Sequence, residues 1–357
     1  MKLASDARSR AIQIWLLAVA ALVFALVIVG GATRLTESGL SIVEWRPVTG
    51  ALPPMSEANW NTEFEKYKAI PQYQKVNRGM SLDEFKTIYW WEWGHRFLGR
   101  LVGAAFLLPF LWFLWQGWIA RPMRWRLWLI FGLGGLQGAV GWWMVTSGLV
   151  ERITVAPYRL GFHLTLACVI FGALIWTAQR MGPQRPSEAP DRIRRTAVAL
   201  LVLVVLQIYL GALVAGLRAG YIYNTWPLID GVLIPSADRM FFLTPLWRNF
   251  FENELTVQFI HRMTAYVLWT VAILHAIDAR RTMGQGREAG FAIALAAVVT
   301  VQAGIGIATL LAQTPIGLAL LHQGTAAIVL AVAVMNADGL MGRRGTAPAG
   351  APAMSAP

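Results

Sequence analysis

The feature of this chain that most constrains its fold is a series of eight apolar runs, each about 20 residues long. They lie at 12–31, 97–118, 127–147, 159–178, 196–216, 256–277, 291–311 and 316–336. A helix of about 20 residues crosses a hydrocarbon core of about 30 Å. The sequence therefore predicts an all-α integral membrane protein with eight transmembrane helices. With 56% hydrophobic and 14% charged residues, the net charge of +12 does not indicate nucleic acid, and we predict no nucleic-acid partner.

Arginine clusters predict the orientation of these spans. They lie in both tails and in the connections that follow the even-numbered spans, within 2–10, 121–126, 180–195, 280–287 and 343–344. Positive clusters mark cytoplasmic segments, so both termini are predicted to be cytoplasmic. The first span has no small-residue cleavage site followed by a polar chain, and we interpret it as retained. These features favour a multi-pass protein of a bacterial inner membrane, surrounded by lipid.

The chain also repeats itself. GATRLTESGLSIVEWRPVTGALPP follows the first span and GALVAGLRAGYIYNTWPLIDGVLIP follows the fifth, so that Trp45 aligns with Trp226. The second and sixth spans then match as EWGHR and QFIHR. We predict two tandem pseudo-symmetric four-helix bundles. The predicted units are residues 1–190 with an outer loop at 33–88, residues 191–340, and a disordered Ala/Pro/Gly-rich tail at 341–357.

Each predicted half carries one histidine near the start of its second helix and one near the start of its fourth. These residues are His95, His163, His261 and His322. The even-numbered spans all run inward, so the four side chains are expected at similar depth near the outer face, paired within each half. This arrangement indicates bis-histidine heme ligation. Hydrogen bonding between helices or a proton relay are alternatives. Zinc or copper is less favoured, because no cysteine or carboxylate completes a closed site.

Two other residues with ligand chemistry are interpreted as structural. Cys168, the only cysteine, lies within the fourth span and is predicted to be a buried thiol. His275 follows His261 by 14 residues on one helix, a spacing that would serve stacked hemes, but no second helix repeats it. We predict a position at the cytoplasmic membrane interface for His275. Three glutamines in odd-numbered spans are predicted to hydrogen-bond between helices, namely Gln137, Gln207 and Gln302.

Charged residues accompany the histidines of the second and sixth spans. Arg96 and Arg262 directly follow His95 and His261. They are candidates for binding heme propionates, with a role as interface anchors as the alternative.

Glu92 precedes His95 by one helical turn, whereas the matching residue of the second half is the neutral Gln258. The asymmetry predicts that only the first half performs chemistry. Glu92 would stabilise developing positive charge or accept a proton. An ion pair with Arg96 is the alternative.

Several motifs together resemble the heme A synthase family. They are EWGHRFLGR with RLTESGLSIVEWRPVTGALPP upstream, FHLTLA, FIHRMTAY and LHQGTAA, and the similarity runs from about residue 12 to 337. The resemblance implies that the C8 methyl of heme O is oxidised to a formyl group, giving heme A for terminal oxidases. It implies that His261 and His322 hold a heme b cofactor, while His95 and His163 bind the substrate heme. The chain resembles the branch without a cysteine pair in the first outer loop, which includes proteobacterial and mitochondrial members.

From the resemblance we expect heme O as substrate and heme O synthase as a partner, and a homo-oligomer is compatible with it; the electron donor is not identified by the sequence. The expected reaction is two hydroxylations of the methyl group, after which the geminal diol loses water. Two alternatives remain. One is a diheme b-type cytochrome that only transfers electrons, and the other is a heme carrier or assembly scaffold. An electron-transferring cytochrome has no need for the difference between Glu92 and Gln258, and a heme carrier would need only one labile site.

Overall fold

A computed structural model describes residues 2–182 and 187–342. Within these residues, eight long helices are apolar enough to cross a membrane. They are α1 (Lys2–Leu35), α4 (Leu82–Trp115), α5 (Arg121–Thr146), α6 (Pro157–Met181), α7 (Asp191–Gly216), α11 (Glu254–Met283), α12 (Arg287–Leu311) and α13 (Ile316–Met341). The predicted all-α class and the eight spans are confirmed. The predicted disordered tail falls outside the described residues, except for its first two positions.

Local signals fix where the helices that carry histidines begin. α4 starts at a capping box in which Ser81 Oγ accepts from Glu84 N at 3.3 Å and Ser81 N donates to Glu84 Oε2 at 2.7 Å. α11 starts at Asn253, whose Oδ1 accepts from two backbone N–H groups of the first turn. Proline at the first helical position begins α6 at Pro157. These starts place each histidine within an unbroken helix.

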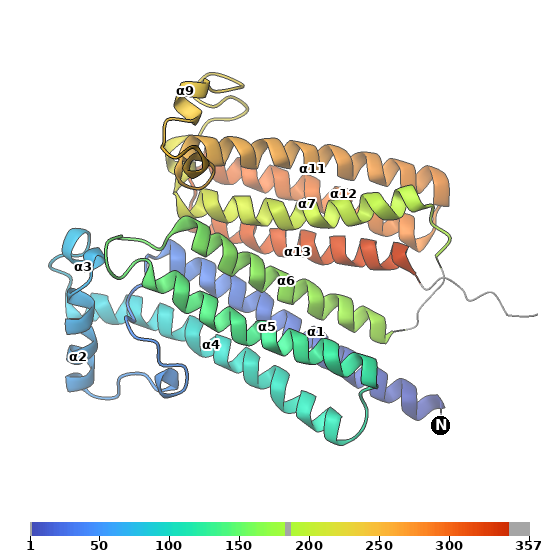
Figure 1. Ribbon diagram of the computed structural model, residues 1–357, viewed down its shortest axis with the longest axis horizontal. Coiled ribbons are helices and arrows are strands. Elements are labelled where there is room, and N and C mark those ends of the chain that lie inside the picture. The colour runs from blue at the N-terminus through green and yellow to red at the C-terminus, as the bar shows by residue number, and fades with distance from the viewer. Residues whose placement is uncertain (1, 183–186, 343–357) are drawn as a thin grey trace, which may run out of the picture.

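The long helices form two groups of four (Figure 1). α1, α4, α5 and α6 lie together, and α7, α11, α12 and α13 lie beside them. In the first group α1 packs on α4 and α6, and in the second α7 packs in the same way on α11 and α13. Helices α1, α6, α7 and α13 make the contacts between the groups. This arrangement is compatible with the predicted pair of four-helix bundles.

Contacts between the outer ends of α1 and α7 agree with the predicted repeat. The guanidinium of Arg34 donates to the Ala215 carbonyl, and Arg218 forms an ion pair with Glu37. Both contacts join residues 181 positions apart. The same offset aligns Trp45 with Trp226. Contact between a residue and its own counterpart is expected where a pseudo-twofold axis passes through an interface.

Two long outer segments connect the helices. The first contains η1 (Thr49–Ala51), α2 (Glu57–Lys68) and α3 (Pro71–Lys75); the second contains α8 (Ala219–Ile222), α9 (Ala237–Met240), η2 (Leu246–Arg248) and α10 (Asn249–Glu252). Figure 1 shows both at one end of the helices, with the N-terminus at the other. Tyr67 of α2 packs against Phe85 of α4, with ring centroids 5.3 Å apart, and burial raises its pKa to about 12. The first segment is thereby anchored to α4.

This arrangement gives a topology prediction. A reporter fused near residue 60 is expected to lie outside, and one fused after residue 187 inside, because arginine clusters mark the cytoplasmic side. Alkaline phosphatase, which is active outside, and a fluorescent protein, which is fluorescent inside, are each fused at both sites. Each site should then give a signal with one reporter and none with the other, which controls for the level of expression. The reversed pattern would contradict the orientation and place the outer segments in the cytoplasm.

Candidate functional site

The structure brings the four predicted histidines together in the expected pairs. His95 of α4 and His163 of α6 lie close enough for a charge on one to act on the other. His261 of α11 and His322 of α13 are related in the same way. Each pair therefore comes from the second and fourth long helices of one group. Two imidazoles at matching places on the second and fourth long helices of one group are a ligand set suited to heme iron.

Each histidine ring lies against a glycine of the preceding long helix. A Cβ built on that glycine would come within 2.9 Å of His95, 2.9 Å of His163, 3.1 Å of His261 and 2.7 Å of His322. The glycines are Gly30, Gly141, Gly211 and Gly306. Any larger residue would push on the ring, so these glycines set its position. Sequence reasoning missed them, although their recurrence on all four odd-numbered spans was a usable signal.

Glutamines hydrogen-bond to three of the four histidines. Nε2 of Gln137 donates to the backbone carbonyl of His163 at 3.0 Å, and Nε2 of Gln207 does the same for His261 at 3.0 Å. Nε2 of Gln302 donates to the carbonyl of His322, also at 3.0 Å. The prediction that these glutamines hydrogen-bond between helices is confirmed.

The polar atoms around the rings fit a heme ligand set. Oε1 of all three glutamines is buried without a hydrogen-bond partner among the described residues, and so is Nδ1 of His322. An imidazole that binds iron through Nε2 carries a proton on Nδ1 and needs an acceptor there. The described residues contain no cluster of three or more His, Cys, Asp or Glu side chains. A closed zinc or copper site is therefore disfavoured.

Glu92 lies inside the protein, with 2% of its surface exposed. Its Oε1 accepts from Arg96 Nε at 3.0 Å and from Arg96 Nη2 at 2.6 Å. Its Oε2 accepts from Ser41 Oγ and from the backbone N–H of Ile42, both at 2.8 Å. The ion pair with Arg96 that the sequence left as an alternative is present. Four hydrogen bonds fill the capacity of a carboxylate, so Glu92 also ties the first outer segment to α4.

Gln258 occupies the matching position in the second half. Glu92 accepts hydrogen bonds from its outer segment, whereas Gln258 donates hydrogen bonds to its own. Its Oε1 accepts from Arg262 Nη2 at 2.8 Å, while its Nε2 donates to the carbonyls of Ala219 and Tyr223. The first loop presents donors and needs a carboxylate, whereas the second presents carbonyls and needs an amide. The difference between Glu92 and Gln258 thus has a structural cause in addition to any catalytic one.

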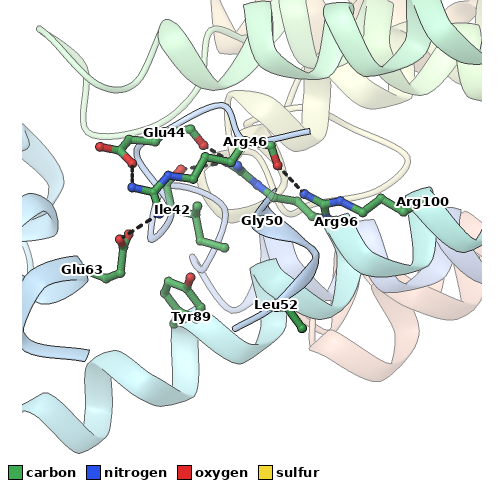
Figure 2. Close-up of a pocket in the computed structure, with 9 residues that line it drawn as sticks. All are labelled: Ile42, Glu44, Arg46, Gly50, Leu52, Glu63, Tyr89, Arg96 and Arg100. Carbon is green, nitrogen blue, oxygen red and sulfur yellow. Dashed lines mark hydrogen bonds and ion pairs between the residues drawn. The ribbon is translucent and has the colours of Figure 1, made fainter. Parts of the chain in front are cut away.

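The two arginines proposed to bind propionates are engaged with the outer segments. Arg96 donates to the carbonyls of Glu44 at 2.9 Å and Ile42 at 2.7 Å, and Arg262 donates to that of Tyr223 at 3.0 Å. Figure 2 shows Arg96 and Arg100 beside a cavity of about 30 Å³, enough for one water molecule. Nη1 of Arg100 is buried there without a partner among the described residues. Propionate binding by Arg96 and Arg262 stays a prediction.

The remaining two candidates lie away from the paired histidines. Cys168 is buried, as predicted. His275 is buried, with 2% of its surface exposed, and its predicted place at the cytoplasmic membrane interface stays a prediction. Its Nε2 lies 3.1 Å from Nδ2 of Asn336 on α13. His275 therefore joins α11 to α13 inside the protein, because a partner for its imidazole is available there.

The two groups of helices differ in how their second and third members pack. α11 packs along α12, where Trp269 Nε1 donates to Thr300 Oγ1 at 3.0 Å, whereas α4 touches α5 only sparsely. In the first half, Gly103 follows His95 by the same number of residues as Trp269 follows His261. Gly135 likewise precedes Gly141 by the same number of residues as Thr300 precedes Gly306. A Cβ at either glycine would meet nothing within 4 Å. The first half is therefore open on the side where the second is closed.

The fold and the site define an eight-helix membrane protein in which each group of four long helices carries a pair of histidines. A family model described as cytochrome oxidase assembly protein matches residues 13–334. Over 343 residues, covering 96% of this chain and 94% of the relative, the sequence is 60% identical to heme A synthase of Rhodopseudomonas palustris (strain BisA53). It is 61% identical over 335 residues to heme A synthase of Bradyrhizobium sp. (strain BTAi1), covering 94% of this chain and 92% of the relative. The chain belongs to the heme A synthase family.

Proposed function

We propose that the protein oxidises the C8 methyl of heme O to a formyl group and so forms heme A for a terminal oxidase. The reaction consists of two hydroxylations, each of which takes its oxygen atom and its two-electron oxidant from outside this chain, after which the geminal diol loses water. The observation that carries the proposal is the presence of two histidine pairs, one in each group of four long helices, in a chain about 60% identical to heme A synthases. The protein is an oxidoreductase embedded in a membrane, and we place it in the bacterial inner membrane with both termini in the cytoplasm.

We assign heme b to His261 and His322 and the substrate to His95 and His163. The closed packing of α11 on α12, with Trp269 bonded to Thr300, suits a resident cofactor. The sparse contact between α4 and α5 suits a substrate that must enter and leave. A heme b bound in the second half would supply one-electron transfer. The N-terminal half, residues 1–190, then holds the substrate, and the C-terminal half, residues 191–340, holds the cofactor.

For Glu92 we propose electrostatic stabilisation of positive charge that develops at the substrate methyl. Proton transfer to Glu92 is less favoured, because it would require one of its four hydrogen bonds to break. The carboxylate, one turn before His95, neutralises Arg96, the residue that directly follows His95. Without it, the guanidinium would add an unpaired positive charge to this site. Heme O synthase as a partner and a homo-oligomeric state are further proposals from the family, and the electron donor is not identified.

The function is tested by extracting the pigments of the purified protein and of membranes that contain it. Heme A or a hydroxylated heme O is the expected product when heme O is supplied. Heme b alone, in cells that make heme O, would select the electron-transferring cytochrome. Unchanged heme O bound without heme b would select a carrier.

The assignment of the halves gives a second prediction. Replacing Gly103 with Trp and Gly135 with Thr installs in the first half the pair that closes α11 on α12. We expect heme A formation to fall by about 10²-fold, because displaced substrate loses its reactive position, while heme b content stays normal. Gly103→Ala is the matched control and should turn over normally. Normal heme A formation in the double variant would contradict the assignment of the substrate to the first half. Loss of heme b from the double variant would contradict it as well.

A further inference from the structure

Each odd-numbered long helix carries a glycine against which a histidine ring packs. Three of these helices also carry a glutamine four residues earlier, which places it one turn away on the same face. The pairs are Gln137 with Gly141, Gln207 with Gly211, and Gln302 with Gly306. In α1, Leu26 stands four residues before Gly30. Among the four paired histidines, only His95 therefore lacks a glutamine at this position.

All four rings pack against their glycines in the same plane. Against Gly141, Gly211 and Gly306, the nearest ring atom to the built Cβ is Cε1, followed by Nδ1. Against Gly30, the nearest ring atom is Nε2 at 2.9 Å, followed by Cδ2 at 3.4 Å. A half-turn of the imidazole about its Cβ–Cγ bond exchanges these two atoms with Cε1 and Nδ1, and a hydrogen-bond partner decides between the two orientations. His95 thus differs from the other three in having leucine in place of the glutamine that could fix its ring.

The glutamine amide is placed to act on the ring as well as on the backbone. Nε2 of Gln207 lies 3.0 Å from Nδ1 of His261, and Nε2 of Gln137 lies 3.2 Å from Nδ1 of His163. Oε1 at the same end of each side chain is buried and unpartnered among the described residues. A half-turn of the amide group would exchange Oε1 with Nε2, so that Oε1 accepts the Nδ1 proton of an imidazole whose Nε2 binds iron, and the hydrogen bond to the backbone carbonyl is given up. Leucine offers no such acceptor.

We propose that Gln137, Gln207 and Gln302 are positioning residues that orient the iron-binding imidazoles of their histidines, and that Leu26 leaves His95 as the exchangeable ligand. The proposal rests on the proposed heme ligation by the four histidines. A cofactor must stay bound, whereas a substrate must be released after oxidation. Both histidines of the cofactor pair have a glutamine, and the one without it belongs to the substrate pair. Release of the product therefore begins on the His95 side.

The first experiment uses Gln207→Leu and Gln207→Glu in the purified protein with its bound heme b. An acceptor on Nδ1 makes the imidazole more basic and stabilises ferric iron. We therefore expect Gln207→Leu to raise the midpoint potential of the heme and Gln207→Glu to lower it, as measured by redox titration. Release of heme b to excess apomyoglobin should be about 10- to 100-fold faster from Gln207→Leu. A merely structural glutamine would not give potential shifts of opposite sign.

The second experiment uses Leu26→Gln, a change of similar volume. The protein is loaded with ferric heme b as a probe, and its transfer to apomyoglobin is expected in two phases. The faster phase is assigned to the substrate pair by its loss in His163→Ala. Leu26→Gln should slow this phase by about 10- to 100-fold and leave the slower phase unchanged.

The outcomes separate this inference from the function on which it rests. Unchanged potentials in both Gln207 variants, or an unchanged fast phase in Leu26→Gln, would overturn the positioning role while heme binding stands. Heme content that is unaffected by His261→Ala and His322→Ala would overturn the proposed ligation itself. If Leu26→Gln fails to fold, the Gln207 variants decide the question alone.

Discussion

Replacing His261 or His322 with alanine is expected to remove heme b from the purified protein and abolish its low-spin absorption. The two imidazoles are the proposed ligands of this heme, and the described residues contain no group of three or more His, Cys, Asp or Glu side chains that could hold a metal ion in their place. Loss of an outer partner of a metal ligand alone costs about 10- to 100-fold in affinity, so loss of the ligand itself should cost more. Heme content is measured by pyridine hemochrome spectra after purification in detergent.

His275→Ala is the matched control for this experiment. His275 is a buried histidine of the same helix as His261, and it is hydrogen-bonded to α13, yet it stands apart from the pair. The variant loses a buried hydrogen bond, which costs about 1–3 kcal/mol of stability, and should retain heme b. Equal loss of heme from all three variants would indicate general unfolding. Full heme content in both His261→Ala and His322→Ala would refute the assignment.

Most of the fold could be predicted from the sequence because the bilayer imposes a length and a polarity on each span. The runs near 12–31 and 256–277 predicted α1 and α11, but both helices extend well beyond the apolar part. Polar extensions are stabilised by local caps such as Ser81 and by packing of the outer segments, which hydropathy does not measure. The short helices α8, α9 and α10 have no periodic pattern of their own and follow from tertiary contacts.

The parts of the candidate site that repeat between the two halves could be predicted from the sequence. The parts that depend on a contact with a distant residue could not. The four histidines recur at matched positions, so their pairing followed from topology. The role of Glu92 was harder, because its partners Ser41 and Ile42 lie about 50 residues away in an irregular loop. The burial of His275 depends likewise on Asn336, another helix's residue. Neither contact leaves a signal in the spacing of a single helix.

Glu92→Gln is expected to lower the rate of heme A formation by roughly 10² to 10³, the cost of removing one preorganised electrostatic group. The variant leaves Arg96, the residue that directly follows His95, with an unneutralised charge. It should keep heme b on His261 and His322 and accumulate heme O or a partly oxidised product. Rates are measured as heme A formed per bound heme b, so that a smaller yield of folded protein does not count as lost catalysis.

The same substitution also weakens the attachment of the first outer segment, because an amide cannot accept from both Arg96 and the Ile42 N–H. Ser41→Ala separates the two effects. It removes one hydrogen bond of this attachment, worth about 1 kcal/mol, and leaves the charge of Glu92 in place. If charge at the substrate site is what matters, Ser41→Ala should form heme A at close to the normal rate. An equal loss of heme A formation in Ser41→Ala and Glu92→Gln would show that Glu92 only anchors the first outer segment. Near-normal heme A formation in Glu92→Gln would lead to the same conclusion. The difference between Glu92 and Gln258 would then follow from the hydrogen-bonding groups of the two loops alone.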